Sequence, residues 1–262
     1  MRTTLNGIEI AYTDEREGTA LLLVHGFPLN RLAWIKQWAG LKASHRVIAP
    51  DLRGFGESGA TNGPVAMSRY AEDLMSLIHH LRLGPVTLVG HSMGGYIALA
   101  FAAAYPQALH GLVLVSTKSA ADNLEVAAAR RKLAERVREE GVGIVIDDMA
   151  PRMLSAGNAN TSMAEEVRGL MAPSKPLGII SALQGMADRP NMASRLGLIR
   201  VPTLVISGTE DAVIPPSESE ALAKAIAGAQ LELIPNGGHL VAFECAEAFN
   251  KALSDWMAAR RL

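Results

Sequence analysis

Short apolar runs rich in Val, Ile and Leu recur along the chain, and longer segments with helical periodicity separate them. Each run holds four or five residues with little polar alternation, which is typical of strands buried on both faces of a parallel sheet. We predict such strands at residues 20–24, 46–49, 86–89, 112–115, 203–207 and 231–234. Residues 8–13 do alternate, so we expect the sheet to begin with an antiparallel hairpin at its edge.

Helical patterns occupy the intervals between these runs. Residues 68–81 place apolar side chains on one helical face, and the alanine-rich residues 94–104 end just before Pro106. Strands that alternate with such helices predict an α/β fold. The spacing breaks between Val115 and Thr203, because this separation is far longer than one crossover helix requires.

We interpret residues 119–195, which fill most of this gap, as a helical lid. Within it we predict helices at 123–140, 161–171 and 176–187 and loops at 155–160 and 172–175, and residues 141–154 form an apolar stretch. Residues 1–118 and 196–262 form the core domain in this interpretation. No internal repeat or long linker divides the chain further.

The composition of the 262-residue chain excludes several partners. Hydrophobic residues make up 49%, and 25 basic side chains nearly balance 26 acidic ones, so we expect a large core and no nucleic-acid partner. Cys245 is the single cysteine, which excludes an intrachain disulfide, and we expect it to be a small buried hydrophobic residue. The first residues lack the apolar core of a signal peptide and no run is long enough to span a membrane, so we expect a cytoplasmic protein without a membrane partner.

A glycine-rich turn with a central serine follows the strand predicted at 86–89. It reads Gly90-His91-Ser92-Met93-Gly94-Gly95 and opens a helix, which is the context of a G-x-S-x-G nucleophile elbow. Such a sharp turn strains the serine backbone, and side chains at the flanking glycines would collide with neighbouring segments. Ser92 is therefore the candidate nucleophile, and the helix N-terminus beside it favours negative charge.

A tetrahedral oxyanion requires at least two hydrogen-bond donors, and the backbone N–H of Met93 is one of them. The segment His25-Gly26-Phe27-Pro28 follows the strand at 20–24, where folds with this elbow place their other oxyanion loop. We expect the backbone N–H of Phe27 to be the second donor.

His239 is the candidate general base, because it lies on a loop that follows a late strand. The positions of the other six histidines argue against this role. His79 and His80 lie in a predicted helix, and His45 and His110 come before strands, at the end of the sheet opposite the ligand-binding edge. His25 and His91 lie in the two expected oxyanion loops. We expect the last two to make supporting hydrogen bonds.

The acid should lie between the serine and the histidine in the chain, which is the order that accompanies this elbow. Asp211 in Gly208-Thr209-Glu210-Asp211 follows the strand at 203–207 and fits this order. Glu210 beside it and Asp122 beyond the strand at 112–115 are alternatives. The acid would accept the second ring N–H of His239 and stabilise the imidazolium.

From about Gly7 to its C-terminus the chain resembles the α/β-hydrolase superfamily. The resemblance rests on four motifs in order, which are His25-Gly26-Phe27-Pro28, Asp51-Leu52-Arg53-Gly54-Phe55-Gly56-Glu57-Ser58, Gly90-His91-Ser92-Met93-Gly94-Gly95, and Gly208-Thr209-Glu210-Asp211 with Gly238-His239 behind it. It implies a mostly parallel eight-stranded sheet flanked by helices, with the lid inserted into it.

A finer resemblance, from Ile199 to Asn250, is to bacterial carboxylesterases and the 3-oxoadipate enol-lactonase group. Enol-lactonases usually carry a tryptophan in the lid, whereas the three tryptophans of this chain lie outside it, which argues against a dicarboxylate lactone. The elbow serine also argues against haloalkane dehalogenases and epoxide hydrolases of this fold, which use aspartate there.

We therefore predict a carboxylic ester hydrolase that forms an acyl-enzyme on Ser92 and acts on small apolar esters. Methionines of the lid suit an apolar pocket, with Met149, Met153 and Met186 as candidate substrate contacts. No metal-ligand spacing or dinucleotide fingerprint occurs, so we expect no metal and no cofactor. A lactonase, thioesterase or perhydrolase activity of the same site stays open, as does a slow ligand sensor, and no feature indicates an oligomeric state.

Overall fold

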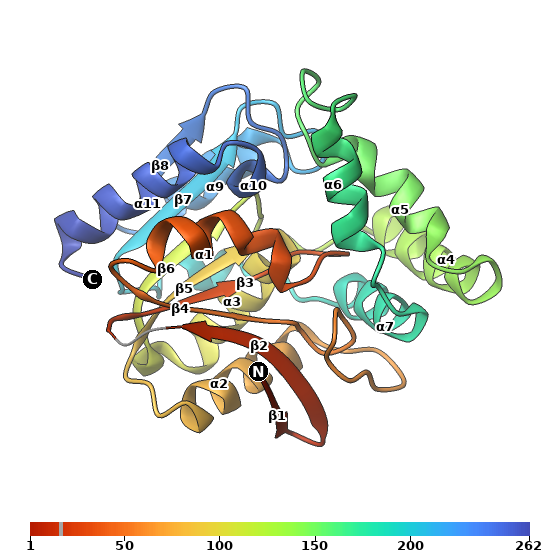
Figure 1. Ribbon diagram of the computed structural model, residues 1–262, viewed down its shortest axis with the longest axis horizontal. Coiled ribbons are helices and arrows are strands. Elements are labelled where there is room, and N and C mark those ends of the chain that lie inside the picture. The colour runs from red at the N-terminus through yellow and green to blue at the C-terminus, as the bar shows by residue number, and fades with distance from the viewer. Residues whose placement is uncertain (16–17) are drawn as a thin grey trace.

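The computed structural model describes residues 1–15 and 18–262, and an eight-stranded sheet forms its centre (Figure 1). The strand order is β1-β2-β4-β3-β5-β6-β7-β8. β2 is antiparallel to both of its neighbours, β1 and β4, and all the other neighbouring strands pair in parallel. The predicted sheet with its antiparallel edge hairpin is confirmed. Its strands are β1 (Arg2–Leu5), β2 (Ile8–Glu15), β3 (Ala20–Val24), β4 (Arg46–Pro50), β5 (Val86–His91), β6 (Leu109–Val115), β7 (Thr203–Gly208) and β8 (Gln230–Ile234).

Side-chain alternation along the central strands builds two cores, one on each face of the sheet. In β3, Leu22 and Val24 belong to one core and Leu21 and Leu23 to the other, and all four are fully buried. Helices α2 (Met67–His80), α3 (Met93–Ala104) and α9 (Pro216–Ala225) cover the first face. Helices α1 (Ile35–Leu41) and α11 (Ala246–Arg260) cover the second.

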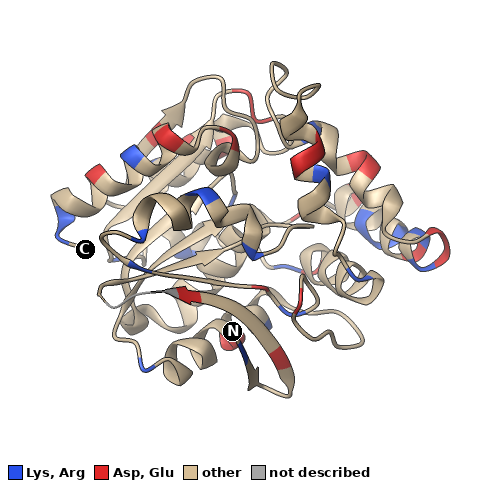
Figure 2. Ribbon diagram, viewed as in Figure 1, with Lys and Arg blue, Asp and Glu red and all other residues tan. Residues whose placement is uncertain are grey.

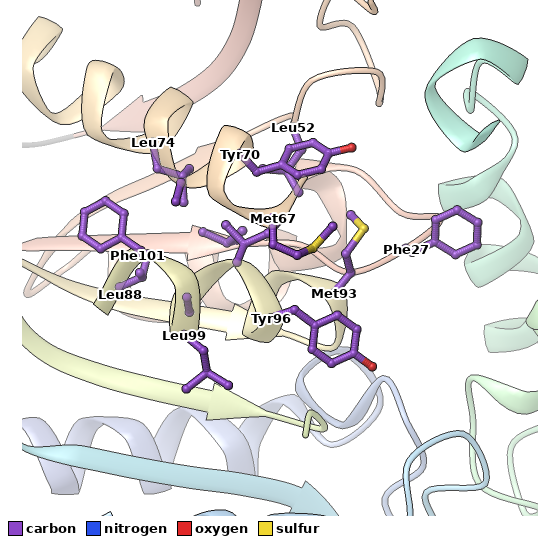
Figure 3. Packing of buried hydrophobic residues seen from close by; sticks show 14 of the residues in the cluster. Phe27, Leu52, Met67, Tyr70, Leu74, Leu88, Met93, Tyr96, Leu99 and Phe101 are labelled. Carbon is purple, nitrogen blue, oxygen red and sulfur yellow. The ribbon is translucent and has the colours of Figure 1, made fainter. Parts of the chain in front are cut away.

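The first core extends along the sheet as far as the loops that carry Phe27 and Met93. Figure 3 shows Leu74, Leu88 and Phe101 at one end of this cluster, and Phe27, Met93 and Tyr96 at the other. The residues at the second end include those that the sequence placed beside the nucleophile. The loop that carries Phe27 and the start of α3 are thus held by the same apolar packing that stabilises the sheet.

One predicted strand begins earlier than expected, and this changes the position of a histidine. β6 starts at Leu109, so His110 lies inside the strand and not before it. The pairing of β5 with β6 shifts register between Val86 and Thr87, which face Leu109 and Gly111, and His110 is the exposed extra residue at this bulge. His110 therefore lies at the start of β6, at the opposite end of the sheet from Ser92.

Between β6 and β7 the chain forms helices and no strand. They are α4 (Leu124–Glu140), α5 (Gly143–Met149), the 3-10 turn η3 (Ala150–Arg152), α6 (Ser162–Met171), α7 (Pro176–Ala187) and α8 (Ala193–Leu196). Asn123 caps α4 by accepting the Val126 N–H at 2.8 Å. These helices stand beside one end of the sheet in Figure 1, and we keep the name lid segment for residues 119–195.

Helix α7 lies directly against the core, and two glycines allow this close approach. A Cβ on Gly178 would lie 1.8 Å from the Gly54 carbonyl oxygen, and one on Gly185 would lie 1.8 Å from that of Val65. The two glycines are seven residues apart and therefore share one face of the helix. The Val65 N–H also donates to the Ser181 carbonyl at 3.1 Å, so backbone contacts fix this helix to the core.

The chain end contains the short helix α10 (Val241–Glu244) and then α11. Cys245, at the junction of the two, is partly exposed and not fully buried as expected, although it packs against the second core. Burial is the main cause that raises its thiol pKa. No helix in the described ranges 1–15 and 18–262 is both long and apolar enough to cross a lipid bilayer.

Candidate active site

Ser92 lies in the tight turn between β5 and α3, with backbone angles of φ 53° and ψ −112°. Positive φ is unusual for a residue with a side chain, so the surrounding structure must hold it there. The Ser92 N–H donates to the Val115 carbonyl at 2.9 Å, and its carbonyl accepts from Thr117 Oγ1 at 2.8 Å. The elbow is therefore fixed by the end of β6, the neighbouring strand.

The glycines of the elbow are required by close backbone packing, as the sequence predicted. A Cβ on Gly90 would lie 2.3 Å from the Gly94 carbonyl oxygen, and one on Gly94 would lie 2.4 Å from that of Val24. Both contacts are with backbone atoms, which cannot move aside cheaply. Any larger residue at either position would displace β3 or the first turn of α3.

Ser92, His239 and Asp211 lie together although they come from three separate loops. His239 Nε2 lies 2.9 Å from Ser92 Oγ, and His239 Nδ1 lies 2.9 and 3.0 Å from the two Asp211 carboxylate oxygens. Because a carboxylate only accepts, Nδ1 carries the ring proton and Nε2 is left to accept the Ser92 proton. His239 is fully buried and Ser92 is 8% exposed.

Asp211 is held as a carboxylate by its neighbours. Burial alone would raise its pKa, but His239 and the N–H groups of Ile214 and Val213 together lower that pKa below the usual value. The two N–H groups donate to Asp211 Oδ1 at 2.8 and 2.9 Å. An ionised Asp211 can therefore stabilise a protonated His239 without moving.

The two alternative acids lie elsewhere. Glu210 is exposed, and its N–H donates to the Gly237 carbonyl at 2.8 Å. Asp122 Oδ2 instead pairs with Arg130 Nε at 2.6 Å and Arg189 Nη1 at 2.7 Å. Neither carboxylate takes part in the hydrogen bonds of His239, so Asp211 is the residue in the position of the acid.

The backbone N–H groups of Phe27 and Met93, the two expected oxyanion donors, are available to a ligand. Met93 is the first residue of α3 and Phe27 follows the end of β3, and neither N–H donates to another group in the part of the chain that is described. Phe27 lines the cavity into which Ser92 opens. The helix N-terminus at Met93 adds its positive dipole end beside Ser92 Oγ.

His25 and His91 support the two loops, which is the role expected for them. The Leu52 N–H donates to His25 Nε2 at 3.0 Å, and His25 Nδ1 donates to the Gly26 carbonyl at 2.9 Å. His91 Nε2 donates to the His239 carbonyl at 2.9 Å. Burial, reinforced by the nearby His239 ring, lowers the pKa of His91 to about 3, so its ring is neutral at neutral pH.

A cavity of about 430 Å³ opens beside Ser92, and the lid segment forms much of its wall. Its apolar and aromatic lining comprises Phe27, Tyr96, Val126, Ala129, Leu133, Met149, Leu183, Met186, Val213 and Ile214. Charged side chains of Lys118, Asp122, Arg130, Asp148 and Arg152 also line it. A second cavity of about 110 Å³ adjoins the first, since Tyr96 and Lys118 line both.

The structure separates the three methionines proposed as substrate contacts. Met149 and Met186 line the cavity beside Ser92, whereas Met153 does not. Met153 is fully buried in a third apolar cluster with Leu29 and Leu240. The expectation for Met153 was therefore wrong, and the cavity wall is also more charged than methionines alone suggested.

Several residues around these two cavities were not foreseen. Tyr96 follows Ser92 by four residues on α3, so one helical turn brings its ring to the cavity, and this spacing could have been recognised. Arg189 lies 4.1 Å over the Tyr96 ring and pairs with Asp122. Asp122 precedes α4 and Arg189 follows α7, and no sequence pattern links residues so far apart.

The stretch from Asp51 to Ser58 contacts the loop at 25–28 through the bond from the Leu52 N–H to His25, and it lies outside the cavity beside Ser92. The Asp51 carboxylate accepts the N–H of Arg31 and that of Glu57, both at 2.8 Å, and pairs with the Arg31 side chain. Gly56 has φ +50°, and a Cβ there would lie 2.3 Å from this carboxylate. We interpret the motif as a rigid turn. No group of His, Cys, Asp and Glu suited to a metal ion occurs in the described residues.

Comparison with known proteins agrees with this fold. Residues 19–245 match the family described as alpha/beta hydrolase fold. A solved thermophilic esterase from Thermogutta terrifontis, described as malate bound, is 41% identical with a TM-score of 0.95, covering 100% of this chain and 97% of that one. An enol-lactonase from Burkholderia xenovorans LB400 is 27% identical with a TM-score of 0.91, covering 98% and 100%. A 3-oxoadipate enol-lactonase 2 of Acinetobacter baylyi is 27% identical over 94% of this chain and 91% of its own.

Proposed function

The chain belongs to the α/β-hydrolase family, and within that family we propose that it is a carboxylic ester hydrolase that forms an acyl-enzyme on Ser92. The observation that carries this proposal is the hydrogen-bonded series Ser92, His239 and Asp211 at the wall of a cavity. The likeness to an esterase over the full chain supports the same reaction class.

The mechanism follows from the protonation states of the three residues. His239 Nε2 takes the proton of Ser92 Oγ as this oxygen attacks the ester carbonyl, and Asp211 stabilises the imidazolium that forms. The N–H groups of Phe27 and Met93 hold the oxyanion. His239 then protonates the leaving alcohol, and a water molecule that gives its proton to His239 releases the acid and restores Ser92.

The cavity supports a small, largely apolar ester as substrate. Its volume of about 430 Å³ lies in the lower part of the range for small-molecule sites. Of its charged residues, Asp122 pairs with Arg130, and Asp148 pairs with Arg152 at 2.5 Å. Lys118 lines the cavity and has no ion pair within the described residues. Its ammonium group could therefore bind a carboxylate at the end of a substrate's acyl chain, which is a second feature to test.

The test is hydrolysis of p-nitrophenyl esters of graded acyl length by the wild type and by Ser92→Ala. We expect activity on the short esters and a loss on the order of a millionfold in Ser92→Ala, because the nucleophile is removed. Ser76→Ala, a change on α2 remote from the cavity, serves as the matched control and should keep full activity. Ester hydrolysis by Ser92→Ala at nearly the wild-type rate would refute the proposal.

The same panel separates the related activities. A succinate half-ester compared with a butyrate ester tests the role of Lys118, and Lys118→Met should reduce any preference for the former. A lactone is an intramolecular ester, and the two enol-lactonase relatives make it the second candidate substrate. A single burst of product without further turnover would instead indicate a slow ligand sensor.

A further inference from the structure

One carboxylate bridges the histidine loop and the lid segment. Glu244, the last residue of α10, accepts the Gly238 N–H at Oε2 over 2.6 Å, directly before His239 in the chain. At Oε1 it accepts the Ser155 N–H at 3.0 Å, the Ser155 hydroxyl at 2.5 Å and the Asn158 side-chain amide at 2.8 Å. Hydrogen bonds to an ionised carboxylate are stronger than those between neutral groups.

The histidine loop is held by the lid on both sides of His239. Before His239, Gly238 packs so tightly that a Cβ would lie 2.3 Å from the Ser155 nitrogen and 2.4 Å from the Leu154 carbonyl carbon. After His239, the Leu240 N–H donates to the Met153 carbonyl at 2.7 Å. The peptide units around the candidate base therefore contact residues 153–158, and Glu244 ties the two segments together. Figure 1 shows α10 on the side of the core that faces α6.

We propose that Glu244 is a positioning residue that couples the lid segment to His239. This inference rests on the proposed function, since it assigns Glu244 a role toward the base of that reaction. Ser155 is buried and Glu244 is partly buried, so these bonds are only partly weakened by water. Because His239 must stay within hydrogen-bond distance of both Ser92 and Asp211, a shift of its backbone reduces turnover.

Glu244→Gln is the first test, because it keeps the length of the side chain. A glutamine can accept from Ser155 and Asn158 through its one carbonyl oxygen, but it then presents an amide N–H₂ to the Gly238 N–H. We expect kcat for a short acetate ester to fall about tenfold to a hundredfold with KM within about a factor of three, as for a misplaced catalytic group. Glu244→Asp keeps the charge but not the reach, and should not restore activity.

The lid side of the bridge gives a second, independent variant. Ser155→Ala with Asn158→Ala leaves Gly238 and Glu244 intact, and the proposal predicts that kcat falls here as well. Combined with Glu244→Gln, the losses should be less than multiplicative, since both changes break the same bridge. Asn123→Ala is the matched lid control, because it removes the α4 cap remote from Glu244 and should keep kcat.

Two readouts do not depend on ester turnover. The rate of Ser92 labelling by a fluorophosphonate should fall in parallel with kcat, and the downfield proton resonance of His239 Nδ1–H should shift in Glu244→Gln. That resonance is assigned by its loss in His239→Ala. If the wild type hydrolyses no ester, the proposed function fails while these two measurements still test the bridge. Unchanged labelling and an unchanged resonance in Glu244→Gln, with the fold intact, would overturn the inference.

Discussion

Ser92, Asp211 and His239 are buried and lie on loops at the carboxyl ends of the strands. Charged residues instead recur along the helices of the lid segment (Figure 2), and many of them are exposed. The loops are fixed by backbone contacts too close for any side chain, as at Gly90 and Gly94. The outer helices α4 to α6 instead carry surface ion pairs such as that of Arg136 with Glu140 at 2.7 Å. Exposed pairs of this kind add little to stability.

The difference indicates a division of tasks between the two regions. The loops must hold three side chains within hydrogen-bond distance, which requires a strained and tightly packed backbone. The lid segment shapes the cavity wall through Met149, Met186 and Leu183, and none of the three hydrogen-bonded side chains of the loops belongs to it. Helix α7 and the bridge at Glu244 are the places where the two regions are joined. We therefore expect changes in the loops to affect chemistry and changes in the outer lid to affect stability or selectivity.

The largest expected effect after that of Ser92 lies at the acid. Asp211→Asn should reduce kcat by about ten-thousandfold, because an amide can hold the wrong imidazole tautomer and cannot stabilise the imidazolium. Glu210→Gln, the exposed neighbour, should retain nearly full activity. Steady-state hydrolysis of a short acetate ester measures both variants. A reversed order of the two would show that the acid is not Asp211.

A smaller effect concerns stability at low pH and comes from the buried His91. The unfolded chain binds a proton at this residue near pH 6.5, whereas the folded protein does so only near its lowered pKa of about 3. The contribution of His91 is therefore fully present above pH 6.5 and is lost at about 1.4 kcal/mol per pH unit as the pH falls below it. The free energy of unfolding in urea, measured at pH 7.5 and pH 5.5, should fall less in His91→Gln than in the wild type. His80→Gln, an exposed histidine on α2, is the control; equal pH dependence in all three proteins would contradict this account.

A change that weakens α4 in the outer lid should lower the free energy of unfolding but leave kcat unchanged. Asn123→Ala removes the cap of α4 and should lower the free energy of unfolding by about 1 kcal/mol. Its kcat on a short acetate ester should stay at the wild-type value, because α4 contacts none of the three catalytic side chains by hydrogen bonds. Denaturant unfolding and steady-state kinetics on the same preparation check both statements. A fall in kcat as large as that of Glu244→Gln would mean that the whole lid positions the site.

The smallest effect is a change in acyl preference. Met186→Ala enlarges the cavity, and each further methylene that it can bury is worth about 0.8 kcal/mol, or roughly fourfold in kcat/KM. The acyl length of highest kcat/KM should therefore increase, while the rate on acetate stays within about a factor of ten. Met163→Ala, a lid methionine outside both cavities, should leave the optimum in place. If acetate hydrolysis is lost while Ser92 is still labelled, Met186 itself must contribute more than selectivity.

The sequence by itself determined the sheet, the elbow and the order of the triad, because each depends on a short-range pattern. An apolar run predicts a buried strand, and glycines around a serine predict a turn without room for side chains. Strand ends place Ser92, Asp211 and His239 at one edge of the sheet, so even their proximity could be foreseen. The Asp211 assignment depended on this rule. The rule does not separate Asp211 from its neighbour Glu210, and only the structure shows that Asp211 accepts from His239 while Glu210 is exposed.

Only the tertiary structure decided which side chains surround the cavity and which hold the loops in place. Met149 and Met153 are four residues apart and both touch the third apolar cluster, yet Met149 lines the cavity whereas Met153 is fully buried and does not. Helical spacing alone does not reveal this difference. The bridge from Glu244 to Ser155 joins residues 89 positions apart, and no local pattern records such a contact. Long-range hydrogen bonds depend on how separate elements pack, so they emerge only once the lid and the sheet are placed together.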